Sequence, residues 1–147
     1  MQTVVKSFSR LSNKELYEIL KFRSTVFVVE QECVYLDIDG VDLDAYHVYI
    51  KDQDEIVAYL RVINKGKRLS EVSIGRVISR YRRKGLGTAV MKEGIKVAKE
   101  KFNATKIKIG AQKYAVPFYE QVGFKVIPNG DYIEDGQPHV YMIYEEK

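Results

Sequence analysis

The chain has 147 residues, of which 46% are hydrophobic and 30% charged. A domain commonly has about 100–150 residues, so we expect one domain over residues 1–147, and this composition excludes disordered and fibrous proteins. The net charge is only +4. No apolar run approaches the roughly 18 residues that a membrane-spanning helix needs, and the first residues lack the pattern of a secretory signal. Because Cys33 is also the only cysteine, we expect a cytoplasmic protein without a membrane partner.

The pattern of apolar residues predicts one mixed α/β domain. Ser12 and Glu15 have the spacing of a capping box, which marks the start of a helix at Asn13. Runs rich in Tyr, Val and Ile predict strands, and the acidic segment 34–44 reads as a loop. The expected elements are strand 3–8, a helix from 13, strands 45–51, 56–63 and 72–79, helix 86–102, strand 106–111, helix 117–122, and strands 124–127 and 139–144.

This order is β-α-β-β-β-α-β-α-β-β. Strands 72–79 and 106–111 are joined through a helix, so they form a parallel crossover. The sheet is therefore expected to be mixed.

The turn before the second long helix has the chemistry of an anion site. Arg82, Arg83 and Lys84 precede two glycines, Gly85 and Gly87. Helix N-termini present unpaired N–H groups, and glycine lets a ligand approach the backbone closely. A solvated basic turn is the plain alternative, and a nucleic-acid-binding module is another. The basic residues occupy one turn and not an extended stripe, so we favour a phosphate or pyrophosphate ligand over nucleic acid.

Two motifs resemble those of the GNAT acetyltransferase superfamily. Arg82-x-x-Gly85-x-Gly87 is similar to its acetyl-CoA signature, and 115–124 resembles its Ala-x-x-Phe-Tyr-x-x-x-Gly-Phe helix. Further segments resemble the ElaA-type subgroup, so that the likeness covers nearly the whole chain. These segments are 26–33, 37–42, His47, 73–77, 110–112 and 134–139.

The resemblance implies an acetyl-CoA-dependent N-acetyltransferase whose sheet is splayed open between strands 72–79 and 106–111. The pantetheine arm would lie in the splay. Its expected contacts are the backbone at Val77 and Ile78, the side chain of Gln112, and, for the pyrophosphate, the turn formed by Arg82, Arg83, Lys84, Gly85, Leu86, Gly87 and Thr88. The superfamily often has Asn where this chain has Gln112, whose amide reaches further.

Acyl transfer from a thioester to an amine needs a base for the amine and benefits from an acid for the departing thiolate. The motif match places Tyr119 beside the sulfur as the acid. Without the resemblance, Tyr119 would read as an aromatic residue that packs beside Phe118. Transfer would be direct, so Cys33 is not expected to be a nucleophile; it reads as a small buried residue.

The base is left open by the sequence. The candidates are Glu30, Glu71, His47, Asp135 and His139. Histidine titrates near neutrality, although a lone histidine in a strand is more often structural. Glu30 follows an apolar run in which burial would raise its pKa, and it could equally anchor the chain.

The acidic segment 34–44 could serve several purposes. Asp37, Asp39 and Asp42 lack the positions of an EF-hand, so no metal site is expected. The loop could form a turn or one wall of a pocket for a cationic acceptor. Arg76, in the middle of a strand, would need a carboxylate from this loop as its partner if it is buried.

The expected function is therefore transfer of an acetyl group to a primary amine on a small molecule or peptide. The residues expected near the acceptor are Glu30, Asp42, His47, Arg76, Asp135 and His139. A GNAT fold that binds acyl-CoA as a sensor, with little catalysis, is the alternative. The sequence predicts neither the acceptor nor the oligomeric state.

Overall fold

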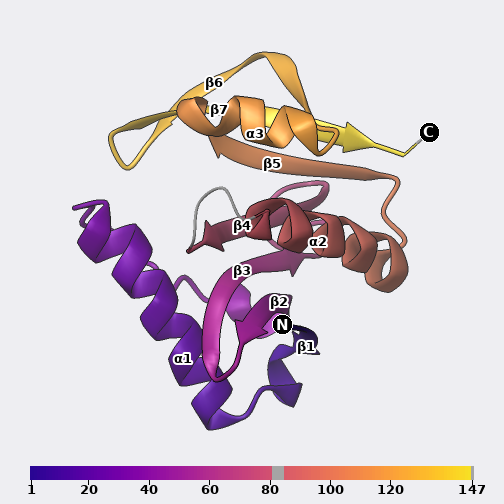
Figure 1. Cartoon of the computed structure of the whole chain (residues 1–147). Coiled ribbons are helices and arrows are strands. Elements are labelled where there is room, and N and C mark those ends of the chain that lie inside the picture. Colours follow the sequence, from indigo (N-terminus) through magenta and orange to yellow (C-terminus); the bar gives the residue numbers. More distant parts are fainter. Residues whose placement is uncertain (81–84, 147) are drawn as a thin grey trace.

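The computed structural model describes residues 1–80 and 85–146, which form one seven-stranded sheet in the order β1-β2-β3-β4-β5-β7-β6 (Figure 1). The elements follow the predicted sequence of strands and helices. They are β1 (Gln2–Ser7), α1 (Asn13–Arg23), β2 (Ala45–Asp52), β3 (Glu55–Ile63), β4 (Val72–Ser79), α2 (Leu86–Phe102), β5 (Lys106–Gln112), α3 (Val116–Gln121), β6 (Lys125–Glu134) and β7 (Gln137–Glu145). The mixed α/β prediction is confirmed.

Several elements begin or end one or two residues from their predicted bounds, and two differ by more. The first helix keeps its Ser12–Glu15 capping box, but beyond Arg23 the chain continues as a π-helix over Ser24–Glu30. The strand predicted at 124–127 runs on to Glu134. The register of β6 against β7 shifts between Val126 and Asp131, so the sheet accommodates the intervening proline and glycine as an irregularity, where the sequence pattern suggested an end.

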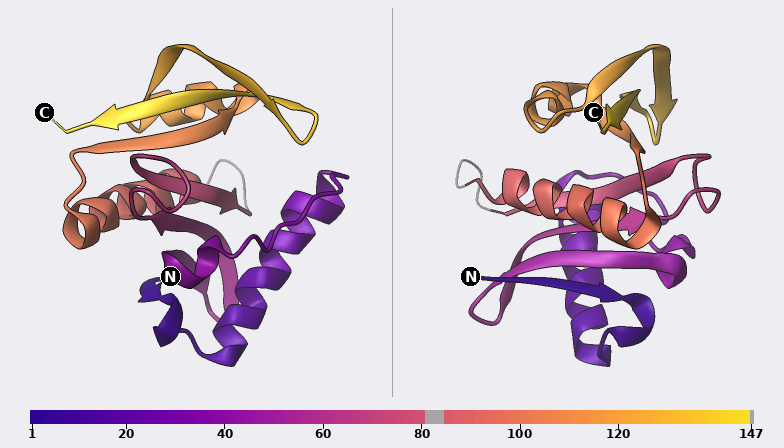
Figure 2. Two further views of the ribbon diagram at one scale, coloured as in Figure 1. Left: turned by 180° about the vertical axis from the view of Figure 1, so that it is seen from behind. Right: turned by 90° about the vertical axis from the view of Figure 1, so that its right-hand side faces the viewer.

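The sheet is covered by helices on both faces, and each face has its own apolar core. On one face Ile19 and Phe22 of α1 pack against Tyr49, Tyr59 and other residues of β2–β4. On the other face α2 and α3 pack against a larger cluster that includes Leu60, Met91 and Phe124. Strands β1–β4 and strands β5–β7 form two halves, and α2 runs between them in sequence (Figure 2). None of the helices described is both long enough and apolar enough to cross a membrane.

The two halves of the sheet are joined by little backbone pairing. β4 and β5 are parallel, as predicted, but only Val72↔Ile107 and Ser73↔Lys108 are in register as partners. Beyond Ser73 the two strands part. The pairing of β4 with β3 is also irregular, with a register shift between Tyr59 and Arg61.

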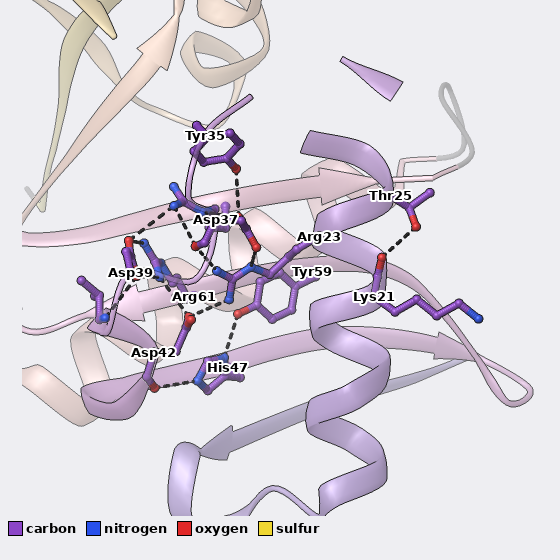
Figure 3. Close-up of polar contacts among 12 residues, drawn as sticks. Lys21, Arg23, Thr25, Tyr35, Asp37, Asp39, Asp42, His47, Tyr59 and Arg61 are labelled. Carbon is purple, nitrogen blue, oxygen red and sulfur yellow. Dashed lines mark hydrogen bonds and ion pairs between the residues drawn. The ribbon is translucent and has the colours of Figure 1, made fainter. Parts of the chain in front are cut away.

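A buried ion cluster pins segment 34–44 to the first half of the sheet (Figure 3). Arg23 of α1 contacts Asp37 and Asp42 at 3.1 and 2.6 Å. Arg61 of β3 contacts Asp42 at 2.9 Å and also Asp39. Arg23 and Arg61 are 0% and 1% exposed, so each guanidinium depends on these carboxylates for its charge compensation.

Asp42 contacts both buried arginines, so its removal should lower the free energy of unfolding. An Asp42→Ala variant leaves Arg23 and Arg61 without a shared carboxylate, at an expected cost of about 3–5 kcal/mol. Asp44→Ala is the matched control because Asp44 is exposed in the same turn, where about 0.5 kcal/mol or less is expected. Urea denaturation measures both free energies of unfolding, and equal stability of the two variants would contradict the role of the cluster.

Acid should destabilise the protein through this cluster. Burial alone would raise the pKa of Asp42, but Arg23 and Arg61 outweigh it and lower that pKa. Burial lowers the pKa of His47. Both side chains bind protons more readily in the unfolded chain than in the folded one. Their contribution to the free energy of unfolding is therefore present above their unfolded pKa values, about 4 and about 6.5, and is lost as the pH falls below them. The urea midpoint should fall as the pH is lowered from 7 to 3; a flat or rising profile would contradict this account.

Candidate active site

A cleft of about 910 Å³ lies where β4 and β5 part. One wall is the second half of β4, and the opposite wall is the end of β5. Segments that lie far apart in the sequence complete it: the end of the first helical region, the start of α2, the region of α3, and the β6–β7 hairpin. The cleft therefore exists because the two halves of the sheet pair only at one end.

The start of α2 forms one end of the cleft. Gly85 has φ +72, a left-handed conformation that glycine adopts without steric cost. Leu86, Gly87 and Thr88 follow in the first turn of the helix and line the cleft, where N–H groups of a helix are unpaired and attract anions. A Cβ atom on Gly87 would lie 3.2 Å from the ring of Phe118, so glycine permits this close packing.

Tyr119 of α3 lies in the same cleft. Its ring packs edge-on against Phe118 and Phe124, with centroids 5.1 and 6.2 Å away. Burial, with a smaller effect from Tyr114, raises the pKa of the Tyr119 hydroxyl. The hydroxyl is thus protonated at neutral pH and can donate a hydrogen bond, although it gives up its proton less readily than an ordinary tyrosine.

The other end of the cleft is lined by segment 31–35 and the β6–β7 hairpin. The lining residues here are Gln31, Cys33, Tyr35, Gln112, Glu134, Asp135, Gln137 and His139. The Cys33 thiol lies 3.9 Å from the carbonyl oxygen of Asp135, so the segment and the hairpin approach each other closely. This end carries carboxylates, whereas the end at α2 presents helix N–H groups.

Arg76 connects the cleft to the buried ion cluster. It has φ +53, a left-handed conformation that costs a non-glycine residue about 1–2 kcal/mol. Its side chain pairs with Asp37 at 2.9 Å and Asp39 at 3.4 Å, and its guanidinium lies 5.3 Å from the centre of the Tyr35 ring. The carboxylate partner predicted for Arg76 is therefore present, and it fixes β4 just before Val77 and Ile78.

Comparisons with known proteins agree with this geometry. Residues 9–146 match the family described as "Acetyltransferase (GNAT) domain". The chain belongs to the GNAT acetyltransferase family. Protein ElaA of Escherichia coli is 39% identical over 93% of this chain and 92% of its own length, which makes the chain an ElaA-like member.

Solved structures carry the same fold. The crystal structure of Escherichia coli ElaA superposes with a TM-score of 0.90 at 36% identity, covering 98% of this chain and 99% of that one. An acyl-CoA N-acyltransferase from Pseudomonas aeruginosa gives 0.89 at 34% identity, with the same coverage. An aminoglycoside 6'-N-acetyltransferase complexed with coenzyme A gives 0.71 at 15% identity, covering 97% and 96%, a likeness of fold alone.

The structure of this GNAT domain brings most of the residues expected to bind acetyl-CoA to the cleft. Val77, Ile78, Gln112 and Tyr119 line it together with the first turn of α2. Arg82, Arg83 and Lys84 lie outside the described residues.

Several residues expected at the acceptor site or as bases lie elsewhere. Asp42 and His47 are buried in the ion cluster, where both imidazole nitrogens of His47 have partners. Glu30 ends the π-helix with its side chain exposed, not buried as expected. Glu71 lies beside a separate small cavity and accepts a hydrogen bond from Ser70. Of the expected acceptor residues, the cleft contains Arg76, Asp135 and His139.

Some residues of the cleft were not expected from the sequence. Glu134 and Tyr35 line it, and so does Cys33, which is only partly buried. The Asp135-Gly136 turn signal predicts a hairpin, and a hairpin would carry Glu134 to the same place as Asp135. A second signal in the sequence concerned the ion cluster. Arg23 falls on the apolar stripe of the first helix, and a charged residue at such a position needs a buried partner.

Two substitutions at Arg76 should separate its ion pair from its backbone conformation. Both Arg76→Gly and Arg76→Ala lose the contacts with Asp37 and Asp39, but glycine adopts a left-handed φ freely. We expect both to reduce the free energy of unfolding, and Arg76→Ala to be about 1 kcal/mol less stable than Arg76→Gly. Equal stability in urea denaturation would contradict a left-handed residue at this position.

Proposed function

We propose that this chain transfers an acetyl group from acetyl-CoA directly to a primary amine within a ternary complex, as one catalytic domain. The observation that carries the proposal is the cleft between β4 and β5, which contains a helix N-terminus at one end, Tyr119 along its side and carboxylates at the other end. An anionic cosubstrate and a cationic acceptor could therefore enter the cleft from different ends.

The α2 end suits the coenzyme. The first turn, Leu86–Thr88, offers N–H groups to the pyrophosphate, and Arg82, Arg83 and Lys84 precede it in the sequence. The edge of β4 opposite β5 has no backbone partner in that strand beyond Ser73, so backbone groups near Val77 and Ile78 are available to a pantetheine arm. Members of the GNAT family use an acyl-CoA cosubstrate, and acetyl-CoA is the one proposed here.

The hairpin end suits an amine. Glu134 and Asp135 line it, and carboxylates attract an ammonium group before its deprotonation. The positive charge of Arg76 in the β4 wall of the cleft is compensated by Asp37 and Asp39. A small molecule or a peptide with a primary amine fits this description, and a cytoplasmic location remains a prediction.

Tyr119 is proposed to donate its hydroxyl hydrogen to the departing sulfur. Its raised pKa keeps it protonated, and its rigid aromatic packing fixes the direction of the hydroxyl. Holding the thioester and the amine in one cleft supplies the remaining acceleration through proximity and orientation.

Tyr119→Phe tests this role. Removing the acid should lower kcat by about 100-fold or more, because general acid catalysis contributes at least this much, while acetyl-CoA affinity stays within about twofold. Tyr17→Phe is the matched control, since Tyr17 is 66% exposed on α1 and lies outside the cleft. The measurements are thiol release from acetyl-CoA across a panel of amines and the thermal shift given by acetyl-CoA.

Two results would contradict the proposal. Acetyl-CoA at 100 times its Kd should stabilise the fold by about 2.7 kcal/mol, so the absence of any thermal shift would exclude the coenzyme. A clear shift without turnover of any amine would favour the alternative, an acyl-CoA sensor.

A further inference from the structure

His139 lies at the hairpin end of the cleft, in the middle of three paired strands. It stands in register with Gln112 of β5 on one side and Tyr132 of β6 on the other. Its ring stacks on Tyr132, with centroids 5.3 Å apart and planes at 28°. The His139 side chain is 10% exposed and lines the cleft, so its neighbours hold the ring in place at the border of the cleft.

The hydrogen bonds of His139 define its tautomer. Nδ1 lies 2.8 Å from the carbonyl oxygen of Gln137. A carbonyl oxygen can only accept, so Nδ1 carries the hydrogen and the neutral ring has its lone pair on Nε2. By contrast, Nε2 of His47 donates to the Asp42 carbonyl and Nδ1 accepts from Tyr59. His139 therefore has a basic nitrogen in the cleft, and His47 has none.

The carboxylate of Glu134 lies near the imidazole of His139. Nε2 lies 3.9 Å from Oε2 of Glu134, and the other carboxylate oxygen, Oε1, lies 3.6 Å from Arg68. Gln112 and Tyr132 flank His139 on the neighbouring strands, and the exposed Asp135 lies at the hairpin turn. An imidazolium formed here would gain an ion pair with Glu134 that the neutral ring does not have.

His139 and Tyr119 approach the cleft from opposite faces of the sheet. Side chains alternate along a strand, and Val140, the neighbour of His139, is buried in the core on the α2–α3 face. Tyr119 packs against that same core. His139 must then project to the other face, toward the side of α1. Because the sheet is open between β4 and β5, a thioester held in the gap is accessible from both faces.

We propose that His139 is the general base that removes a proton from the acceptor ammonium. This inference rests on the proposed function. Nε2 takes one proton from the ammonium, and the freed lone pair attacks the thioester carbonyl carbon to form the C–N bond. The C–S bond then breaks, and the nitrogen's second surplus proton reaches the thiolate as CoA forms, with Tyr119 donating to the sulfur. The imidazolium finally releases its proton to water, which balances the reaction.

The decisive experiment is a pH profile of kcat/KM for the wild type and His139→Ala, with the best amine of the panel. We expect kcat/KM at pH 7 to fall by about 10²–10⁴-fold, with the acetyl-CoA thermal shift retained. The variant's rate should rise only toward the pH at which the amine loses its own proton, and added imidazole should restore part of the activity at pH 7. If His139 had only a structural role, His139→Ala would show neither the changed pH profile nor the rescue by imidazole.

Glu134→Gln provides an independent measurement that leaves the imidazole in place. Loss of the carboxylate should lower kcat/KM by less than loss of the imidazole does, because Nε2 remains while the imidazolium formed in the reaction loses its neighbouring carboxylate. If the wild type acetylates amines while His139→Ala keeps the wild-type profile and gains nothing from imidazole, the base is another group. If the wild type acetylates no amine at all, the proposed function fails instead.

Discussion

The short parallel contact between β4 and β5 is the constraint on which the site depends. Two residue pairs hold the halves of the sheet together, and the rest of both strands is left to line a cleft. Parallel strands normally pair along their length, so a cause is needed for the divergence. The left-handed Arg76 interrupts β4 in the part of the strand that lies beyond the last pair with β5, and its side chain contacts Asp37 and Asp39. The ion cluster thus stabilises the fold and shapes the cleft wall.

This arrangement gives each half of the proposed reaction its own surroundings. The face covered by α2 and α3 provides Tyr119, an aromatic residue whose proton is retained by burial. The opposite face provides His139, whose tautomer is set by a backbone carbonyl. Acidic residues gather at the acceptor end, while the helix N-terminus lies at the other. The segregation follows from side-chain alternation in β7 and from packing of α3, and not from proximity in the sequence.

Much of the fold could be predicted from the sequence because local signals were strong. The Ser12–Glu15 capping box and the apolar stripe of 86–102 place two helices, and the strand 72–79 coincides with β4. The motifs around Gly85 and Tyr119 also pointed to residues that line the cleft. The acceptor end was harder, because it depends on long-range pairing. Asp42 and His47 looked like binding residues, but the partners that bury them, Arg23, Arg61 and Tyr59, come from distant elements.

The most direct test of the account is a crystal structure of the complex with acetyl-CoA. We expect the pyrophosphate at the first turn of α2, the pantetheine along β4 between the parted strands, and the thioester between Tyr119 and His139. Acetyl-CoA bound outside this cleft, or with its sulfur beyond reach of the Tyr119 hydroxyl, would contradict it.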